Sequence, residues 1–192
     1  MAKDDVRDHL VEVGLQTFRA GGYNHTGVKD LVAAGDVPKG SFYYYFDSKE
    51  DFACAVIDRY AEGTAGSAIL EDRTYPPLAR LRRYFEMLVS LYEGRGLAEG
   101  CLFGNLSLEM ADQSAAIRAR LAAGFARWQA TLAAVFHEAA GRGDLPPGAD
   151  PDALAAFCLD GWQGALVRMK AEKSAAPLHL FIAMVFDQLL RR

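Results

Sequence analysis

The segment with the most distinctive chemistry lies between positions 39 and 46, where basic, hydroxyl-bearing and aromatic side chains occur together. It reads Lys39-Gly40-Ser41-Phe42-Tyr43-Tyr44-Tyr45-Phe46. On a helix of 3.6 residues per turn its two phenylalanines fall together and can enter a core, while the serine and the last two tyrosines turn outward. Ammonium and hydroxyl donors at the exposed N-terminal end suit phosphate oxygens and base edges. The glycine adds no side chain that would hold the helix off a groove floor. The competing interpretation is that the three tyrosines are packing or dimer residues.

The flanking residues predict a helix-turn-helix that would position this segment. A short helix over 27–34, capped by Thr26, leads into the tight turn Ala33-Ala34-Gly35-Asp36-Val37. Pro38 then begins a second short helix that runs to about Tyr45, since its missing N–H has no helical partner there. Two short helices joined by such a turn have the dimensions of a DNA-reading motif.

The rest of the chain also shows helical spacing, and no segment has the alternation of a strand. The fold class that we predict is all-α, with about nine helices. One helix carries an apolar face from Leu10 to Phe18 and stops at Gly21-Gly22. Glycine and proline breaks and capping residues place the remaining helices at about 48–70, 78–93, 103–111, 114–140 and 150–173, and a last one that begins at Ser174 or Pro177 and runs to 192.

Composition sets further limits. The chain has 192 residues, of which 51% are apolar and 24% charged, so it is a globular protein rather than a disordered tail. It contains no apolar run of the roughly 20 residues that a membrane helix needs and no secretory signal, so we expect no membrane partner. Three widely spaced cysteines argue against a disulfide framework and favour a cytoplasmic location. The net charge of −4 is unfavourable for a nucleic-acid binder and requires that a few well-placed cations suffice.

The N-terminal residues resemble the DNA-binding domain of the TetR family of one-component regulators. The resemblance covers residues 5 to about 55 and is carried by Thr26-Gly27-Val28-Lys29-Asp30-Leu31-Val32, Val37-Pro38 with the aromatic segment, and Ser48-Lys49-Glu50. It implies a helix-turn-helix DNA-binding domain over 1–48 and a helical ligand-binding and dimerisation domain over 49–192. It further implies a homodimer that represses transcription from a palindromic double-stranded operator and is released by a small-molecule effector.

The resemblance also assigns DNA contacts. Carried over by position, contacts to phosphates fall on Thr26, Lys29, Tyr44 and Lys49, and contacts to base edges fall on Lys39, Gly40, Ser41 and Tyr43. One position departs from the family pattern, because Asp36 stands where the family usually has glycine before the valine of the turn. Aspartate tolerates a left-handed backbone better than most residues, so we expect the turn to survive.

Apolar and polar side chains of the middle helices are candidates for an effector site. They are Phe85, Leu88, Tyr92, Cys101, Phe103, Asn105, Leu106, Glu109, Phe125 and Trp128. The competing interpretation is ordinary packing, with Glu109 satisfied by a neighbour such as Arg118 or Arg127. Cys101 lies just ahead of a helix, where the helix dipole favours a thiolate. A thiol-based sensor of oxidants or electrophiles acting through Cys101 is therefore an alternative, as is a small buried Cys101 with no such role.

The last two helices carry apolar stripes that predict a dimer interface, since a two-fold four-helix arrangement would bury them. The interface candidates are Leu159, Trp162, Gln163, Leu166, Met169, Phe181, Ile182, Val185 and Phe186.

An enzyme, or an adaptor that keeps a vestigial DNA-binding head, is the alternative from another class. The sequence holds no catalytic, phosphate-binding or metal-binding motif, and its four histidines are scattered. We therefore expect no catalytic residues, no metal site and no cofactor. Substitution of Tyr44 and Lys49 would separate these alternatives, because only a regulator would lose DNA binding.

Overall fold

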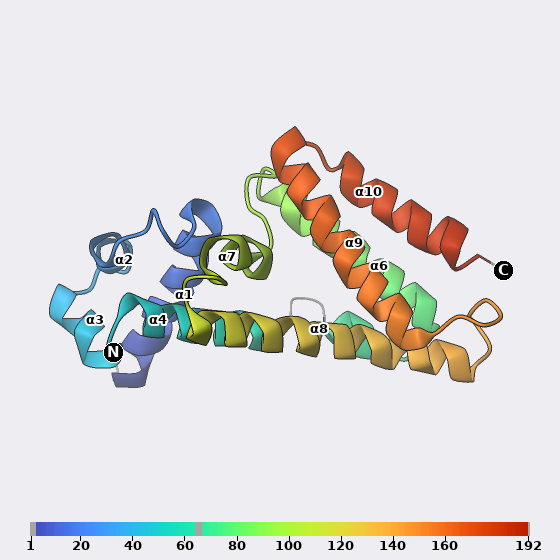
Figure 1. Ribbon diagram of the computed structural model, residues 1–192, viewed down its shortest axis with the longest axis horizontal. Helices are drawn as coiled ribbons and strands as arrows, with labels where there is room; N and C mark the ends of the chain where they lie inside the picture. Colours follow the sequence, from blue (N-terminus) through green and yellow to red (C-terminus); the bar gives the residue numbers. More distant parts are fainter. Residues whose placement is uncertain (1–2, 64–66, 192) are drawn as a thin grey trace. The chain divides into compact units, whose positions relative to one another are not determined.

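The computed structural model describes residues 3–63 and 67–191, and all of its regular elements are helices (Figure 1). They are α1 (Lys3–Gly21), α2 (Val28–Ala34), α3 (Lys39–Tyr45), α4 (Lys49–Glu62), α5 (Ser67–Glu71), α6 (Pro77–Gly94), α7 (Leu102–Met110), α8 (Ala115–Gly141), α9 (Pro151–Glu172) and α10 (Ala176–Ala183), which continues as a π-helical segment, Met184–Leu189. The all-α prediction is confirmed. No described helix is long and apolar enough to cross a membrane.

Two compact units make up the chain. The first contains residues 1–63 and 101–125, and the second contains residues 64–100 and 126–192. The predicted boundary at 48/49 rests on sequence alone and stays a prediction. In the first unit α7 packs on α1 and α4, although α4 ends at Glu62 and α7 begins only at Leu102.

The core of the first unit is built on the aromatic face of α3. Phe42 and Phe46 are buried against Phe52 of α4, with ring centroids 5.2 and 4.9 Å away. Gly14 allows α1 to approach α4 closely, since an added Cβ there would lie 2.5 Å from the Phe52 ring. Arg59 of α4 also pairs with Asp8 of α1 at 2.9 Å. The contacts of Phe42 and Phe46 fix one face of α3, and the opposite face is left to solvent.

Side-chain caps mark the starts of α4 and α8. The Ser48 hydroxyl accepts from the Asp51 amide and begins α4, and the Ser114 hydroxyl accepts from the Ile117 amide and begins α8, each at 3.0 Å. The predicted cap at Thr26 is wrong. Gly27 is the N-cap of α2, and its amide donates to the Asp30 carboxylate at 2.7 Å.

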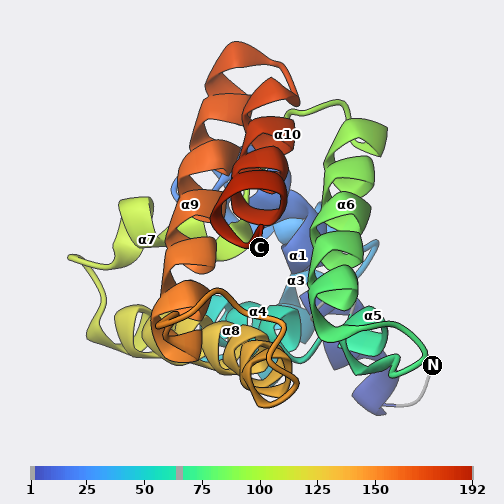
Figure 2. The ribbon, with the colours of Figure 1, turned by 90° about the vertical axis from the view of Figure 1, so that its right-hand side faces the viewer.

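The second unit packs α6, α9 and α10 side by side (Figure 2). Phe85 of α6, Trp162 of α9 and Phe181 of α10 meet with ring centroids 5.0 to 5.4 Å apart. The predicted single helix over 48–70 is wrong, because α4 ends at Glu62 and the short α5 begins at Ser67.

The predicted dimer residues face the interior of the subunit, which corrects the predicted side of both helices. Seven of them are buried within the single chain, and two are half-buried: Leu159, Trp162, Leu166, Met169, Phe181, Ile182 and Val185, then Gln163 and Phe186. Helical spacing identified real apolar stripes, but within the subunit α9 and α10 pack on each other and on α6. Other large apolar side chains of the last two helical segments remain exposed: Phe157, Val167, Leu180, Met184 and Leu189.

Candidate nucleic-acid interface

The turn between α2 and α3 is closed by backbone hydrogen bonds. The amide of Gly35 donates to the carbonyl of Leu31 at 2.9 Å, and that of Val37 donates to Val32 at 3.0 Å. Asp36 has a φ of 50°, so the expectation that aspartate accepts a left-handed backbone here is confirmed.

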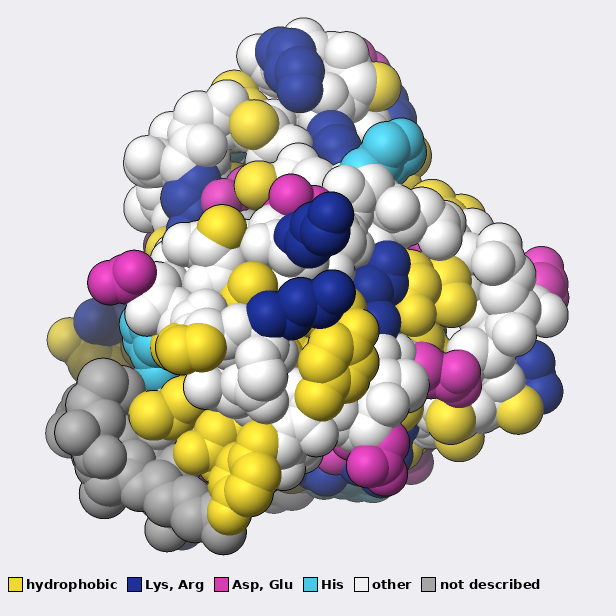
Figure 3. All heavy atoms as spheres, turned by 90° about the vertical axis from the view of Figure 1, so that its left-hand side faces the viewer, with side chains coloured by type: hydrophobic (Ala, Val, Ile, Leu, Met, Phe, Trp, Pro, Cys, Tyr) yellow, Lys and Arg dark blue, Asp and Glu magenta, His cyan; other side chains and the backbone are white. Residues whose placement is uncertain are grey.

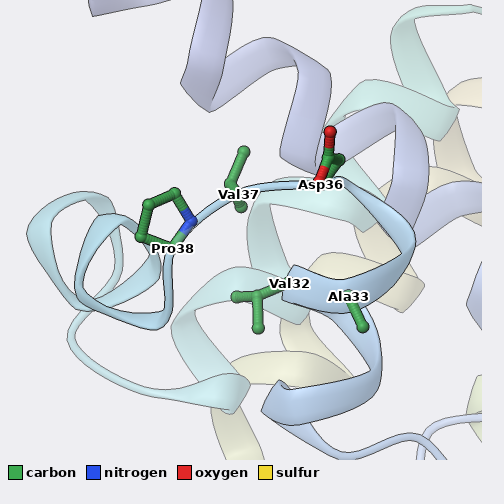
Figure 4. A pocket seen from close by; sticks show the side chains of 5 residues that line it. All are labelled: Val32, Ala33, Asp36, Val37 and Pro38. Carbon is green, nitrogen blue, oxygen red and sulfur yellow. The ribbon is translucent and has the colours of Figure 1, made fainter.

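An open hollow of about 440 Å³ lies beside this turn (Figure 4). Its lining is apolar apart from one carboxylate and consists of Val32, Ala33, Asp36, Val37 and Pro38. Because the lining offers no cation, it does not suit a phosphate, and the chemistry for DNA lies on α3 instead.

The outer face of α3 carries the predicted reading residues. Tyr43 and Tyr44 are 54% and 63% exposed. Ser41 and Tyr45, which helical spacing predicted to turn outward with Tyr44, are instead half-buried. The exposure of Tyr43 and Tyr44 excludes their interpretation as interior packing of the subunit. Gly40 is exposed, and an added Cβ there would meet no atom within 4 Å. A duplex could therefore approach the start of α3 without steric hindrance.

Two lysines supply exposed positive charge beside these tyrosines. Lys29 on α2 and Lys39 at the start of α3 are both exposed, and neither forms an ion pair with any described residue. Figure 3 looks onto the side where α2 and α3 lie in Figure 1, and dark-blue basic side chains lie there beside yellow hydrophobic ones, with some acidic side chains between them. We call Lys29, Lys39, Gly40, Tyr43 and Tyr44 the reading face.

Lys49 makes contacts within the protein that the sequence did not reveal. Its Nζ donates to the carbonyls of Tyr23 and Thr26, both at 2.9 Å, and lies 3.9 Å from the centroid of the Tyr23 ring. Burial lowers the pKa of Lys49, and attraction to Glu109 partly offsets this. An ammonium group has three N–H donors, so one remains for a phosphate. The predicted phosphate contact of Lys49 stays a prediction.

Thr26 is turned inward. It is 3% exposed, and its hydroxyl donates to the carbonyl of Gly22 at 2.7 Å. A buried hydroxyl that already donates to the protein backbone cannot reach a phosphate without rearrangement. We therefore leave Thr26 out of the reading face.

The effector candidates are divided between the two units. Cys101, Phe103, Asn105, Leu106, Glu109 and Phe125 lie in the first, and Phe85, Leu88, Tyr92 and Trp128 lie in the second. All are buried except Asn105, Glu109 and Phe125, which are half-buried. A ligand role for these residues stays a prediction.

Glu109 is satisfied by the backbone of the N-terminal region. Its carboxylate accepts a hydrogen bond from the Asn24 amide at 2.9 Å. Arg118, one of the two arginines expected as a partner, donates instead to the carbonyl of Ala111 at 2.7 Å. Nothing in the sequence pointed to this contact, because 85 residues separate its two partners.

The three cysteines are buried and free. Cys101 is the N-cap residue of α7, is 2% exposed, and has its Sγ 3.7 Å from the Tyr60 hydroxyl. Cys54 and Cys158 pack inside their units, and burial raises the pKa of Cys54 and raises that of Cys158 to about 12. Within residues 3–63 and 67–191 no cluster of three or more His, Cys, Asp or Glu could hold a metal ion.

Comparison with known protein families identifies both parts of the chain. Residues 10–56 match the model of bacterial regulatory proteins of the tetR family, and residues 77–185 match the tetracyclin repressor-like C-terminal domain. The chain belongs to the TetR family. The TetR-family match at the N-terminus contains the whole reading face.

Known relatives of this TetR-family chain are similar to it over almost its whole length. It is 39% identical over 192 residues to the HTH-type transcriptional repressor DhaR of Mycobacterium sp. (strain GP1), covering 99% of this chain and 95% of DhaR. A crystal structure of a regulatory protein TetR from Rhodobacter sphaeroides is similar with a TM-score of 0.87 and 39% identity, covering 93% of this chain and 95% of that one. The reduced form of Escherichia coli NemR has a TM-score of 0.88 and 28% identity, over 95% and 96% of the two chains. The protein is thus a DNA-binding transcriptional regulator and not an enzyme.

Proposed function

We propose that this TetR-family protein is a homodimeric repressor whose two copies of α3 enter successive major grooves of a palindromic operator. The observation that carries the proposal is the reading face itself. Phe42 and Phe46 anchor α3 in the core, so Tyr43, Tyr44 and the open Gly40 are held outward. Two such helices would sit about 34–36 Å apart on one side of a duplex.

Effector release completes the proposed cycle. A small molecule that binds the C-terminal domain more tightly in the conformation that does not fit the operator weakens operator binding by linkage. The candidate residues of the middle helices remain our proposal for that site. Since its target is bacterial DNA, we place the protein in the cytoplasm.

The proposal predicts strongly salt-dependent DNA binding by a few cations. The net charge of −4 gives no general attraction to DNA, so Lys29 and Lys39 carry a large share of the phosphate contacts. Lys29→Ala and Lys39→Ala should each weaken binding to the duplex upstream of the protein's own gene. Each should also reduce the slope of log K against log salt by about 1 per lost contact.

Footprinting of that upstream region, followed by fluorescence anisotropy at several salt concentrations, measures both effects. Arg127→Ala is the control, because Arg127 is an exposed cation on α8 in the second unit. A flat salt dependence, or equal losses for Arg127→Ala and Lys39→Ala, would contradict the proposal. An adaptor or enzyme with a vestigial head would bind no duplex at all.

Thiol-based release through Cys101 remains a second candidate because of its place at the start of α7, beside the Tyr60 hydroxyl. The same binding assay with a thiol oxidant distinguishes the two effector classes. Oxidant-induced release that persists in Cys101→Ser excludes this cysteine as the sensor.

A further inference from the structure

The loop between α1 and α2, residues 22–27, is held from two sides by charged groups. From α4, the ammonium of Lys49 binds the carbonyls of Tyr23 and Thr26. From α7, the carboxylate of Glu109 accepts from the amide of Asn24 at 2.9 Å. The side chain on α4 donates to carbonyls of the loop, and the side chain on α7 accepts from an amide of the loop. Carbonyl and amide groups of the loop therefore both have partners.

The loop approaches the Glu109 carboxylate closely. Gly22 has a φ of +76°, and a Cβ added there would collide with the Glu109 carboxylate. The corner between α7 and α8 makes a second contact with this region, because the Ser114 hydroxyl donates to the Glu50 carboxylate of α4 at 2.5 Å. Glu109 and Ser114 thus both connect this corner to the DNA-binding region, one at the loop and one at the start of α4.

We propose that Glu109 is a positioning residue for DNA binding, whose carboxylate holds the loop 22–27, and through it the start of α2, in the conformation that the reading face needs. The inference rests on the proposed function. It also means that a residue within the C-terminal match, 77–185, completes the DNA-binding head matched by 10–56. Lys29 follows the loop by two residues, so a displaced loop would move one of the two lysines of the reading face.

The test uses the full-length Glu109→Gln variant, which keeps the size of the side chain and removes its charge. Hydrogen bonds to charged acceptors are stronger than those to neutral ones, so the loop should loosen. We expect binding to the upstream duplex to weaken about three- to tenfold. Simple electrostatics predicts the opposite sign, because loss of a negative charge near DNA should strengthen binding.

The matched control is Asp112→Asn. Asp112 is exposed, lies three residues from Glu109 and has no hydrogen bond or ion pair within the described part of the chain. The Asp112→Asn variant should bind DNA as tightly as the wild type or slightly more tightly. If Glu109→Gln binds equally well or more tightly than the wild type, the proposal is overturned.

Hydrogen–deuterium exchange of the free protein gives a readout that needs no DNA. The Asn24 amide should exchange about three- to tenfold faster in Glu109→Gln and at the wild-type rate in Asp112→Asn. Unchanged exchange at Asn24 would refute the role of Glu109 whatever the DNA result. Failure of the wild type to bind any duplex would instead refute the proposed function, and exchange would still decide whether Glu109 holds the loop.

Discussion

At the scale of single residues, α3 separates anchoring from reading. Phe42 and Phe46 are at most 2% exposed, while Tyr43 and Tyr44 are more than half exposed, so neighbouring aromatic side chains have opposite environments. Burial of the two phenylalanines orders the helix, and the tyrosines contribute little to that core. Their substitution should therefore affect DNA binding far more than stability.

Gly40 allows these two properties to be tested in opposite directions. Alanine has the higher helix propensity, and no atom lies within 4 Å of the added Cβ, so Gly40→Ala should stabilise the fold by about 0.5–1 kcal/mol. The same methyl group should hinder approach to the duplex and weaken DNA binding. Urea unfolding and anisotropy measure the two effects. A variant that is more stable and binds DNA as tightly as the wild type would show that α3 does not approach the duplex at Gly40.

At the scale of elements, a buried arginine joins three helices of the second unit. Arg80 of α6 is 2% exposed and donates to the carbonyl of Leu70 at the end of α5 at 2.8 Å. It also pairs with the carboxylate of Glu138 on α8 at 2.5 Å. A buried guanidinium that lost this carboxylate would be left uncompensated, so the pair is needed once the arginine is buried.

This pair predicts an acid-sensitive contribution to stability. The hydrogen bond from Arg80 holds the pKa of Glu138 below its ordinary value of 4.5. The contribution is therefore present above that value and is lost as pH falls through the lowered pKa. Glu138→Gln should be less stable at neutral pH and should lose less stability between about pH 5 and 3, as measured by urea unfolding at each pH.

A matched control for this prediction is Glu172→Gln, which breaks an exposed pair with Arg168 on one helix. Its effect at neutral pH should be slight, since exposed pairs contribute little. If the free energy of unfolding falls by the same amount between pH 5 and 3 in the wild type and in Glu138→Gln, the Arg80 contact is not the source of the acid sensitivity.

At the scale of the whole molecule, the exposed sides of α9 and α10 are the candidate dimer surface. Phe157, Val167, Leu180 and Met184 are each more than half exposed in the single chain, and a two-fold pairing of these helices would bury them. This surface replaces the stripe around Trp162, which is already buried inside the subunit.

Charged substitutions on this surface should dissociate the dimer. In a two-fold interface Val167→Glu places two buried charges near each other, and Leu180→Glu does the same. Size-exclusion chromatography with light scattering should show a dimeric wild type and monomeric variants with unchanged helical circular dichroism. Leu108→Glu on α7, where the leucine is 83% exposed, is the control and should stay dimeric. Dimeric Val167→Glu and Leu180→Glu variants would place the interface elsewhere.

Much of the candidate site followed from local sequence. The burial of Phe42 and Phe46, the exposure of Tyr44 and the left-handed Asp36 depend on residues a few positions apart, so the sequence predicted them. The inward hydroxyl of Thr26 was not predictable in this way. Its partner Gly22 is near in sequence, but only the packed loop makes the inward orientation favourable.

The amino-acid sequence by itself determined the all-helical class, the helix-turn-helix and the side of α3 that enters the core, because helical periodicity acts over one or two turns. Tertiary structure alone decided which apolar stripe of α9 faces α6, how Lys49 is engaged, and that Glu109 meets Asn24. Those outcomes depend on groups that lie far apart along the chain. Whether a side chain is covered or finds a partner is settled only when the helices pack.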